Sequence, residues 1–209
     1  MKTQLAGLCL GERRFLQIRL HAHDDVRDRV GDYALKVYLR DRLVRCLRES
    51  FTTIPWFYIV IEDRDTFDTS DVRPHVHGSI EIPRAPLPKL VDGRVRAKYR
   101  RMAEREGIEE AEYLAGRQKI ISALKKATGN HGGKNPVVNG RSQSNNVWKR
   151  KPYHPLFNLE WVSYALKNMN TISPKLPENR LSTSRGLTQE AQRLWALIRE
   201  GETALRMWP

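Results

Sequence analysis

The first 82 residues contain three stretches that predict strands, and apolar and polar positions alternate in the first and the third of them. In FLQIRLH, residues 15–21, the polar positions are Gln17, Arg19 and His21. IPWFYIVIED, residues 54–63, is rich in aromatic and β-branched side chains, and RPHVHGSIEI, residues 73–82, alternates again. Because the polar turn RDTFDTSD separates the last two stretches, they are expected to pair as a hairpin.

Apolar residues at helical spacing predict a long helix between the first two strands. Leucines recur every four residues from Leu35 to Leu47. Asp32 is expected to cap this helix, which should run to about Ser50.

Capping residues, Gly and Pro divide the rest of the chain. We expect a basic helical stretch at about 94–106, a helix from about Glu109 to Thr128 closed by Gly129, and a loop at 129–146. A helix from Asn158 to about Met169 and a proline-bearing linker at 172–186 should follow. Thr188 opens the last helix, which has Leu187, Ala191, Leu194 and Ile198 on one side.

The chain is strongly basic. Its 209 residues hold 37 Lys and Arg against 24 Asp and Glu, a formal net charge of +13. Residues 84–151 hold 17 basic and 6 acidic residues, and therefore carry +11 of that charge. A nucleic acid is the expected partner, rather than a membrane, because no apolar run reaches the roughly 18–20 residues of a spanning helix. Cys9 and Cys46 lack a paired spacing, which favours a cytoplasmic location.

Two segments interleave cations with aromatic rings, which is typical of surfaces that bind single-stranded nucleic acid. Tyr99 lies within GRVRAKYRRMAER, and Trp148 and Tyr153 flank the cations of WKRKPYHP. The residues expected to contact DNA are Arg94, Arg96, Lys98, Arg100, Arg101, Lys149, Arg150 and Lys151, together with Arg19 on the first strand. The alternative for either segment alone is a solvated helix face or a basic loop.

The stretch HVHGSIEI places two histidines on the polar face of its strand. His75 and His77 alternate with Val76, and the other apolar positions, Ile80 and Ile82, share the side of Val76. A core histidine would instead share that apolar side. Gly78 is expected to leave space beside the pair.

The same parity applied to the second strand adds a carboxylate. Phe57, Ile59 and Ile61 form its apolar set, so Asp63 points toward the core and Glu62 lies on the other face. In a hairpin, Glu62 comes near His75 and His77. Two imidazoles and one carboxylate suit Mn²⁺ or Mg²⁺ with open positions.

A second histidine pair competes for this role. His21 and His23, in LHAHDD, have the same spacing but stand at a strand end before charged residues, with no adjacent glycine. Contact with DNA or simple exposure is the alternative for this pair.

The predicted helix NLEWVSYALKNMN separates an apolar stripe from reactive side chains. Its stripe consists of Leu159, Val162, Leu166 and Met169. Tyr164 and Lys167 lie on the opposite side, although a tyrosine and a lysine three residues apart are also common by chance.

Together, HVHG, the preceding acidic residue and YALK resemble the HUH endonucleases, in particular single-tyrosine initiators of rolling-circle replication. The resemblance covers roughly residues 13–170 and follows the family's order of motifs. It implies an α+β fold with a central antiparallel sheet and helices packed on it. It also implies metal ligation by His75, His77 and Glu62, with Tyr164 as the nucleophile and Lys167 as its helper.

The resemblance further implies a division of the chain and a reaction. Residues 1–170 would form the nuclease domain, with a basic helical insertion at about 84–150, and 171–209 a linker and C-terminal helix. The expected reaction nicks and rejoins single-stranded or hairpin DNA through a 5′-phosphotyrosine intermediate. No helicase domain is expected in this chain, so a host helicase is a candidate partner, and the last helix could instead bring in a second copy.

Two alternatives stay open. Conjugative relaxases and transposases use the same chemistry, although the tyrosine of such relaxases commonly precedes the histidine motif, whereas here it follows. A non-catalytic DNA- or RNA-binding regulator is the alternative from another class.

Overall fold

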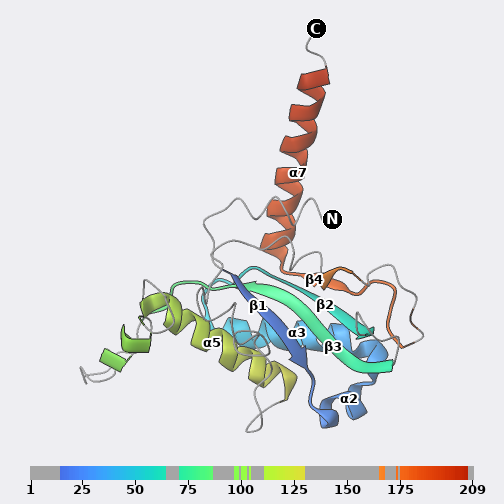
Figure 1. Cartoon of the computed structure of the whole chain (residues 1–209), viewed down its shortest axis with the longest axis vertical. Helices are drawn as coiled ribbons and strands as arrows, with labels where there is room; N and C mark the ends of the chain where they lie inside the picture. Colours follow the sequence, from blue (N-terminus) through green and yellow to red (C-terminus); the bar gives the residue numbers. More distant parts are fainter. Residues whose placement is uncertain are drawn as a thin grey trace.

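The computed structural model describes residues 15–64, 71–86, 97–98, 100–102, 104, 111–129, 165–167, 173 and 175–206. Its strands are β1 (Phe15–His21), β2 (Phe57–Arg64), β3 (Asp71–Glu81) and β4 (Leu181–Thr183). Its helices are α2 (Asp24–Val30), α3 (Asp32–Ser50), α5 (Ala111–Thr128) and α7 (Arg185–Arg206). The described part of the chain is therefore a mixed α and β structure (Figure 1).

The strands form one antiparallel sheet in the order β1-β3-β2-β4. The predicted hairpin is confirmed, because β2 pairs with β3 and sets Glu62 opposite His75. β1 pairs with the other edge of β3, which places Arg19 opposite His77. The histidine strand thus lies in the interior of the sheet, with a neighbour on each side.

One face of the sheet packs on α2, α3 and α5. The apolar positions predicted from parity, such as Ile18, Ile61 and Val76, lie in this core with the leucines of α3. In Figure 1, α3 and α5 lie on one side of the sheet and α7 stands on the other. Asp63, predicted to point toward the core, is buried and accepts a hydrogen bond from Ser173 Oγ, at a point where the β2–β3 register shifts.

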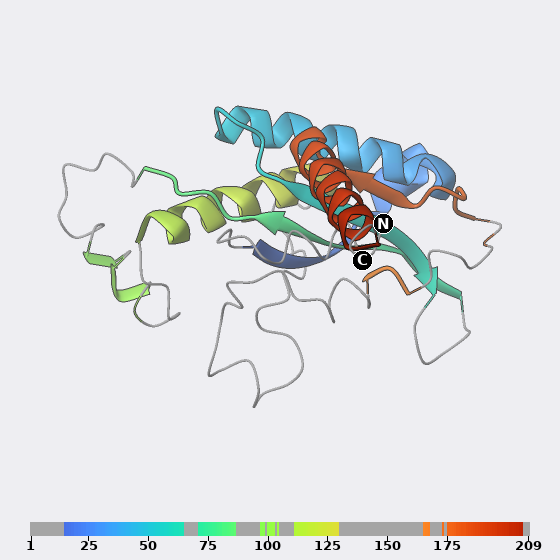
Figure 2. The same ribbon diagram turned by 90° about the horizontal axis from the view of Figure 1, so that it is seen from above.

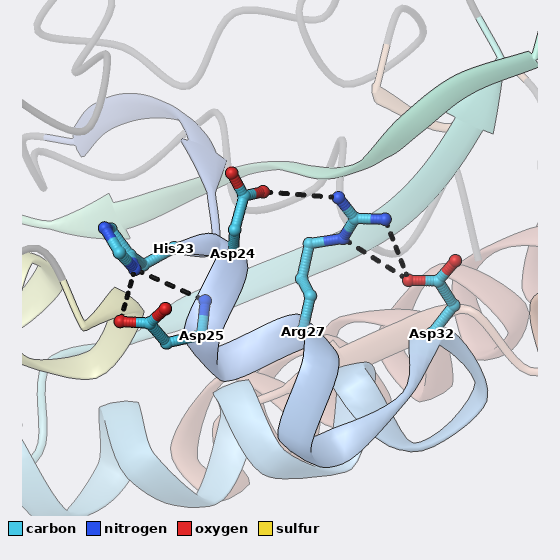
Figure 3. A network of polar contacts seen from close by, with 5 residues as sticks. All are labelled: His23, Asp24, Asp25, Arg27 and Asp32. Atoms are coloured by element: carbon cyan, nitrogen blue, oxygen red, sulfur yellow. Dashed lines mark hydrogen bonds and ion pairs between the residues drawn. The ribbon is translucent and has the colours of Figure 1, made fainter.

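The start of α3 differs from the prediction. Gly31, with φ 74°, occupies the N-cap, and no side chain caps the helix. Asp32 is instead the first helical residue, and its Oδ1 lies 3.4 Å from Arg27 Nη2 (Figure 3). The physical reason is the preceding helix α2, which ends at Val30, so the chain must turn within one residue. Glycine adopts this backbone conformation without a steric penalty.

The central helices match their expected lengths closely. α5 ends at Thr128 and is followed by Gly129 with φ 78°, as predicted. The described residues of the basic stretch at 94–106 are helical, and those of the 158–169 helix are limited to 165–167. The predicted loop at 129–146 lies outside the described residues, apart from Gly129.

The C-terminal segment corrects the expected linker. Residues 181–183 form β4, the fourth strand of the sheet, and α7 begins at Arg185 rather than Thr188. Thr188 Oγ1 donates to the Ser184 carbonyl within the first turn. Seen from above, α7 rises from the sheet toward the viewer (Figure 2). No described helix is long and apolar enough to cross a membrane.

Candidate metal centre

Three polar side chains converge on the sheet face that carries α7. His75 Nε2 lies 3.0 Å from His77 Nε2, and His77 Nε2 lies 3.7 Å from Glu62 Oε2. One potential ligand atom from each residue falls within 4.8 Å of the others. The proximity of Glu62 to the two histidines, predicted from strand parity, is therefore confirmed. We call these three residues the Glu-His-His cluster.

The cluster is more deeply buried than its polar face suggests. His75 and His77 are 2% and 1% exposed, and Glu62 is fully buried. A second apolar cluster covers this face, in which Tyr58 and Val60 of β2 pack with Leu166 and with Leu187 and Ala191 of α7. Leu166 was expected on the buried stripe of its helix, and it is buried here. Both faces of the sheet are thus covered, at least in part.

Burial shifts the pKa values of Glu62 and His77. It raises the pKa of Glu62 to about 6, against the opposing charges of Lys167, Arg180 and Arg19. It also lowers the pKa of His77 to about 2, and the neighbouring cations and His75 act in the same direction. His77 is consequently a neutral imidazole at physiological pH, which is the form that binds a metal ion.

Lys167 reaches the cluster from a distant part of the chain. Its Nζ lies 3.4 Å from Glu62 Oε2, and the side chain is half-buried. Ala165 and Leu166, the residues before it, pack in the apolar cluster on the same face. Tyr164, the expected nucleophile, lies outside the described residues. It nevertheless adjoins Ala165 in the chain.

The competing histidine pair is divided between two roles. His21 lies opposite His75 across the β1–β3 pair, and the two rings stack with centroids 5.5 Å apart. His23 instead begins α2, where its Nδ1 accepts from the Asp25 backbone N–H at 3.4 Å and lies 3.2 Å from Asp25 Oδ2 (Figure 3). The described contacts of these two histidines are therefore different: His21 stacks on His75, and His23 caps α2.

Gly78 has a different role from the one expected. A Cβ at this position would overlap the carbonyl oxygen of Tyr58 on the neighbouring strand. The missing side chain therefore permits close approach of two backbones rather than clearing space beside the histidines.

Two arginines act on the cluster electrostatically, and the sequence had not indicated a role for one of them, Arg180. Arg19 is half-buried on β1, opposite His77. Arg180 is 2% exposed, and its carbonyl accepts from the Ile61 N–H beside Glu62. No periodic pattern in the sequence marks Arg180, because it follows a proline-bearing stretch and precedes a strand of three residues.

The remaining expected DNA contacts are only partly described. Lys98, Arg100 and Arg101 are exposed, as a DNA-binding surface requires. The others, Arg94, Arg96, Lys149, Arg150 and Lys151, lie outside the described residues.

No protein-family model matches the chain, and searches of curated proteins and of solved structures found no match. The arrangement must therefore be judged by its chemistry. Two imidazoles, one carboxylate and adjacent cations can hold a divalent ion beside an anionic substrate.

Proposed function

We propose that this protein is a metal-dependent endonuclease that nicks and rejoins single-stranded DNA through a covalent phosphotyrosine. The single observation that carries the proposal is the convergence of Glu62, His75 and His77 in one buried cluster, with Lys167 Nζ 3.4 Å from Glu62 Oε2. The order of the HVHG and YALK motifs, which resembles the HUH endonucleases, supports the same reaction.

The donor set of the cluster fits a small divalent ion. Two neighbouring ligands of an octahedral ion at about 2.1 Å stand roughly 3 Å apart, and the two Nε2 atoms are separated by 3.0 Å. Neither oxygen of Glu62 accepts a well-formed hydrogen bond from a described residue, although both are buried. His75, His77 and Glu62 would hold Mn²⁺ or Mg²⁺, which when bound neutralises charge on a phosphodiester and orients it.

The other roles belong to side chains of the chain itself. Tyr164 Oη would attack phosphorus, so that a phosphotyrosine bond forms as the bond to the 3′ oxygen breaks. The phenol loses its proton and the departing oxygen gains one, which leaves a free 3′-hydroxyl. Lys167 would stabilise the developing phenolate or the phosphate. Because the phosphotyrosine retains the energy of the phosphodiester, a 3′-hydroxyl can reverse the step without ATP.

Initiation of rolling-circle replication of a plasmid or phage is the process that we propose. The tyrosine follows the histidine motif, and the basic residues, of which Lys98, Arg100 and Arg101 are exposed, suit an unpaired strand. Relaxase and transposase activities would use the same cluster and the same tyrosine.

A covalent-capture assay tests the reaction. The wild type is incubated with Mn²⁺ and a labelled pool of single-stranded and hairpin DNA, and adducts that survive denaturation are separated on a gel. We expect an adduct with the wild type and with Tyr153→Phe, and none with Tyr164→Phe or His77→Ala. DNA binding without an adduct in any sample would favour a non-catalytic binding protein.

A further inference from the structure

Arg19 lies immediately beside the Glu-His-His cluster. It stands opposite His77 in the antiparallel β1–β3 pair. Side chains at directly opposite positions project from the same face of a sheet, with Cβ atoms about 4.5–5.5 Å apart. Arg19 therefore projects from the face that carries the cluster, on the side away from Glu62 and β2.

Part of the Arg19 guanidinium is buried without a hydrogen-bond partner among the described residues. Its Nε is buried and makes no hydrogen bond there, and the side chain forms no ion pair with a described carboxylate. Arg27 and Arg193 form ion pairs with Asp32 and Glu190, whereas the Nε of Arg42 on α3, like that of Arg19, makes no hydrogen bond to a described residue. What distinguishes Arg19 is its place opposite His77. A buried N–H donor normally has a partner, and an anion bound at the cluster would supply one to Arg19.

The charges around the cluster lead to the same conclusion. Glu62 is the one carboxylate of the cluster, whereas Arg19, Lys167 and Arg180 all act on it electrostatically. A bound dication would add two further positive charges. An anion bound at the cluster would be attracted by these charges.

We propose that Arg19 is a catalytic residue that binds the non-bridging oxygens of the phosphate held at the cluster. A guanidinium offers its donors in a planar fork that matches two phosphate oxygens. Lys167 forms an ion pair with Glu62 of β2, whereas Arg19 lies on β1 opposite His77. The two cations therefore lie on different sides of the cluster. The inference rests on the proposed function, since it assigns a phosphodiester as the anion at that site.

A phosphate-binding role and a structural role predict opposite changes in affinity for the metal ion. Removal of a cation near the cluster weakens repulsion of Mn²⁺, so Arg19→Ala should leave Mn²⁺ affinity unchanged or increase it. The same substitution should weaken the binding of phosphate. If Arg19 merely supported the strand, its loss would disturb the metal-ligating side chains and weaken the binding of both Mn²⁺ and phosphate.

The experiment measures both affinities without any DNA cleavage. Calorimetry gives the Mn²⁺ affinity, and broadening of the ³¹P resonance of inorganic phosphate by bound Mn²⁺ gives the phosphate affinity. The variants are Arg19→Ala and Arg19→Lys, which keeps the charge but loses the fork. The matched control is Arg40→Ala, because Arg40 is a surface residue of α3 paired with Asp41.

Arg19→Ala should weaken phosphate binding about tenfold or more, as expected for a lost charge-assisted hydrogen bond. Arg19→Lys should fall between the wild type and Arg19→Ala, and Arg40→Ala should match the wild type. Phosphate affinity within twofold of the wild type in Arg19→Ala, or a joint loss of Mn²⁺ and phosphate affinity, would overturn the inference. If Arg19→Ala fails to fold, the comparison of Arg19→Lys with the wild type decides by the same criteria.

Failure of the proposed function gives a different result. In that case the wild type would not bind Mn²⁺ at all. Phosphate titration of the metal-free protein then decides on Arg19 alone, since a weaker affinity in Arg19→Ala than in Arg40→Ala supports it and equal affinities reject it.

Discussion

The Nε2 atoms of His75 and His77 lie 3.0 Å apart, on two residues of one strand whose rings turn toward each other. Both rings are almost completely buried. Neutral imidazoles at this distance share a single hydrogen bond at most, whereas a cation between them would use both lone pairs. A metal ion bound between the two rings would therefore stabilise the folded protein.

Mn²⁺ should raise the melting temperature of the wild type. A ligand that binds only the folded state adds about 2.7 kcal/mol when its concentration is one hundred times its dissociation constant. Differential scanning fluorimetry should show an increase that a chelator reverses and that His77→Ala lacks. His23→Ala is the matched control, since His23 caps α2. An equal shift in His77→Ala would place the metal elsewhere.

Replacement of Glu62 by Gln should stabilise the metal-free protein at high pH. Burial raises the pKa of Glu62 from 4.5 to about 6, so the folded state holds this proton more tightly than the unfolded state. The resulting penalty is absent below the unfolded pKa and fully present above the folded pKa. It amounts to about 2 kcal/mol near neutral pH.

Urea denaturation of Glu62→Gln and the wild type, at about pH 8 and about pH 3.5, measures this difference. The advantage of the variant should appear at the higher pH and vanish at the lower one. Glu112→Gln, an exposed position on α5, provides the control. A variant that is less stable than the wild type at the higher pH would contradict the assigned environment.

Loss of the Lys167 charge should slow the reaction more than it weakens binding. Lys167→Met should lower the rate of adduct formation by about 10²-fold or more, the usual contribution of a positioned catalytic group. Retention of oligonucleotide on filters should change little, because we expect the cations of residues 84–151 to supply most of the affinity. Lys126→Met removes a surface ion pair with Glu49 and should leave both quantities unchanged. Equal losses of rate and affinity would make Lys167 a binding residue only.

Two glycines should respond to alanine in opposite directions. At Gly78 a Cβ would overlap the Tyr58 carbonyl oxygen, so Gly78→Ala should destabilise the sheet by roughly 1–3 kcal/mol or more. At Gly201, within α7, a Cβ meets open space, and alanine should stabilise the helix by up to about 1 kcal/mol. Chemical denaturation of both variants tests the close approach of β2 and β3.

Strand parity accounted for the part of the site that lies on β2 and β3. Period-two alternation determines which side chains share a face, so Glu62 could be placed beside His75 and His77 before the register was known. The depth of their burial could not be predicted, because the residues that pack on this face, such as Leu166 and Leu187, are remote in sequence. Arg180 is hidden for the same reason.

Short elements escaped the sequence pattern. β4 has three residues and α2 has seven, which are too few to establish a period. β4 exists because β2 offers it an open edge, as its register Val60 to Leu181 shows. α2 buries Val26 alone, so its amphipathic signal is weak, and the turn at Gly31 moved the start of α3 by one residue relative to the expected cap.

The most direct test of the covalent mechanism is fragmentation mass spectrometry of the adduct. Tryptic cleavage after Arg150 and Lys167 leaves Tyr153 and Tyr164 in the same segment, so fragment ions must decide between them. The mechanism predicts a 5′-phosphorylated nucleotide on Tyr164, formed only with Mn²⁺ and lost in His77→Ala. A nucleotide on Tyr153, or an adduct that forms without the two histidines, would contradict it.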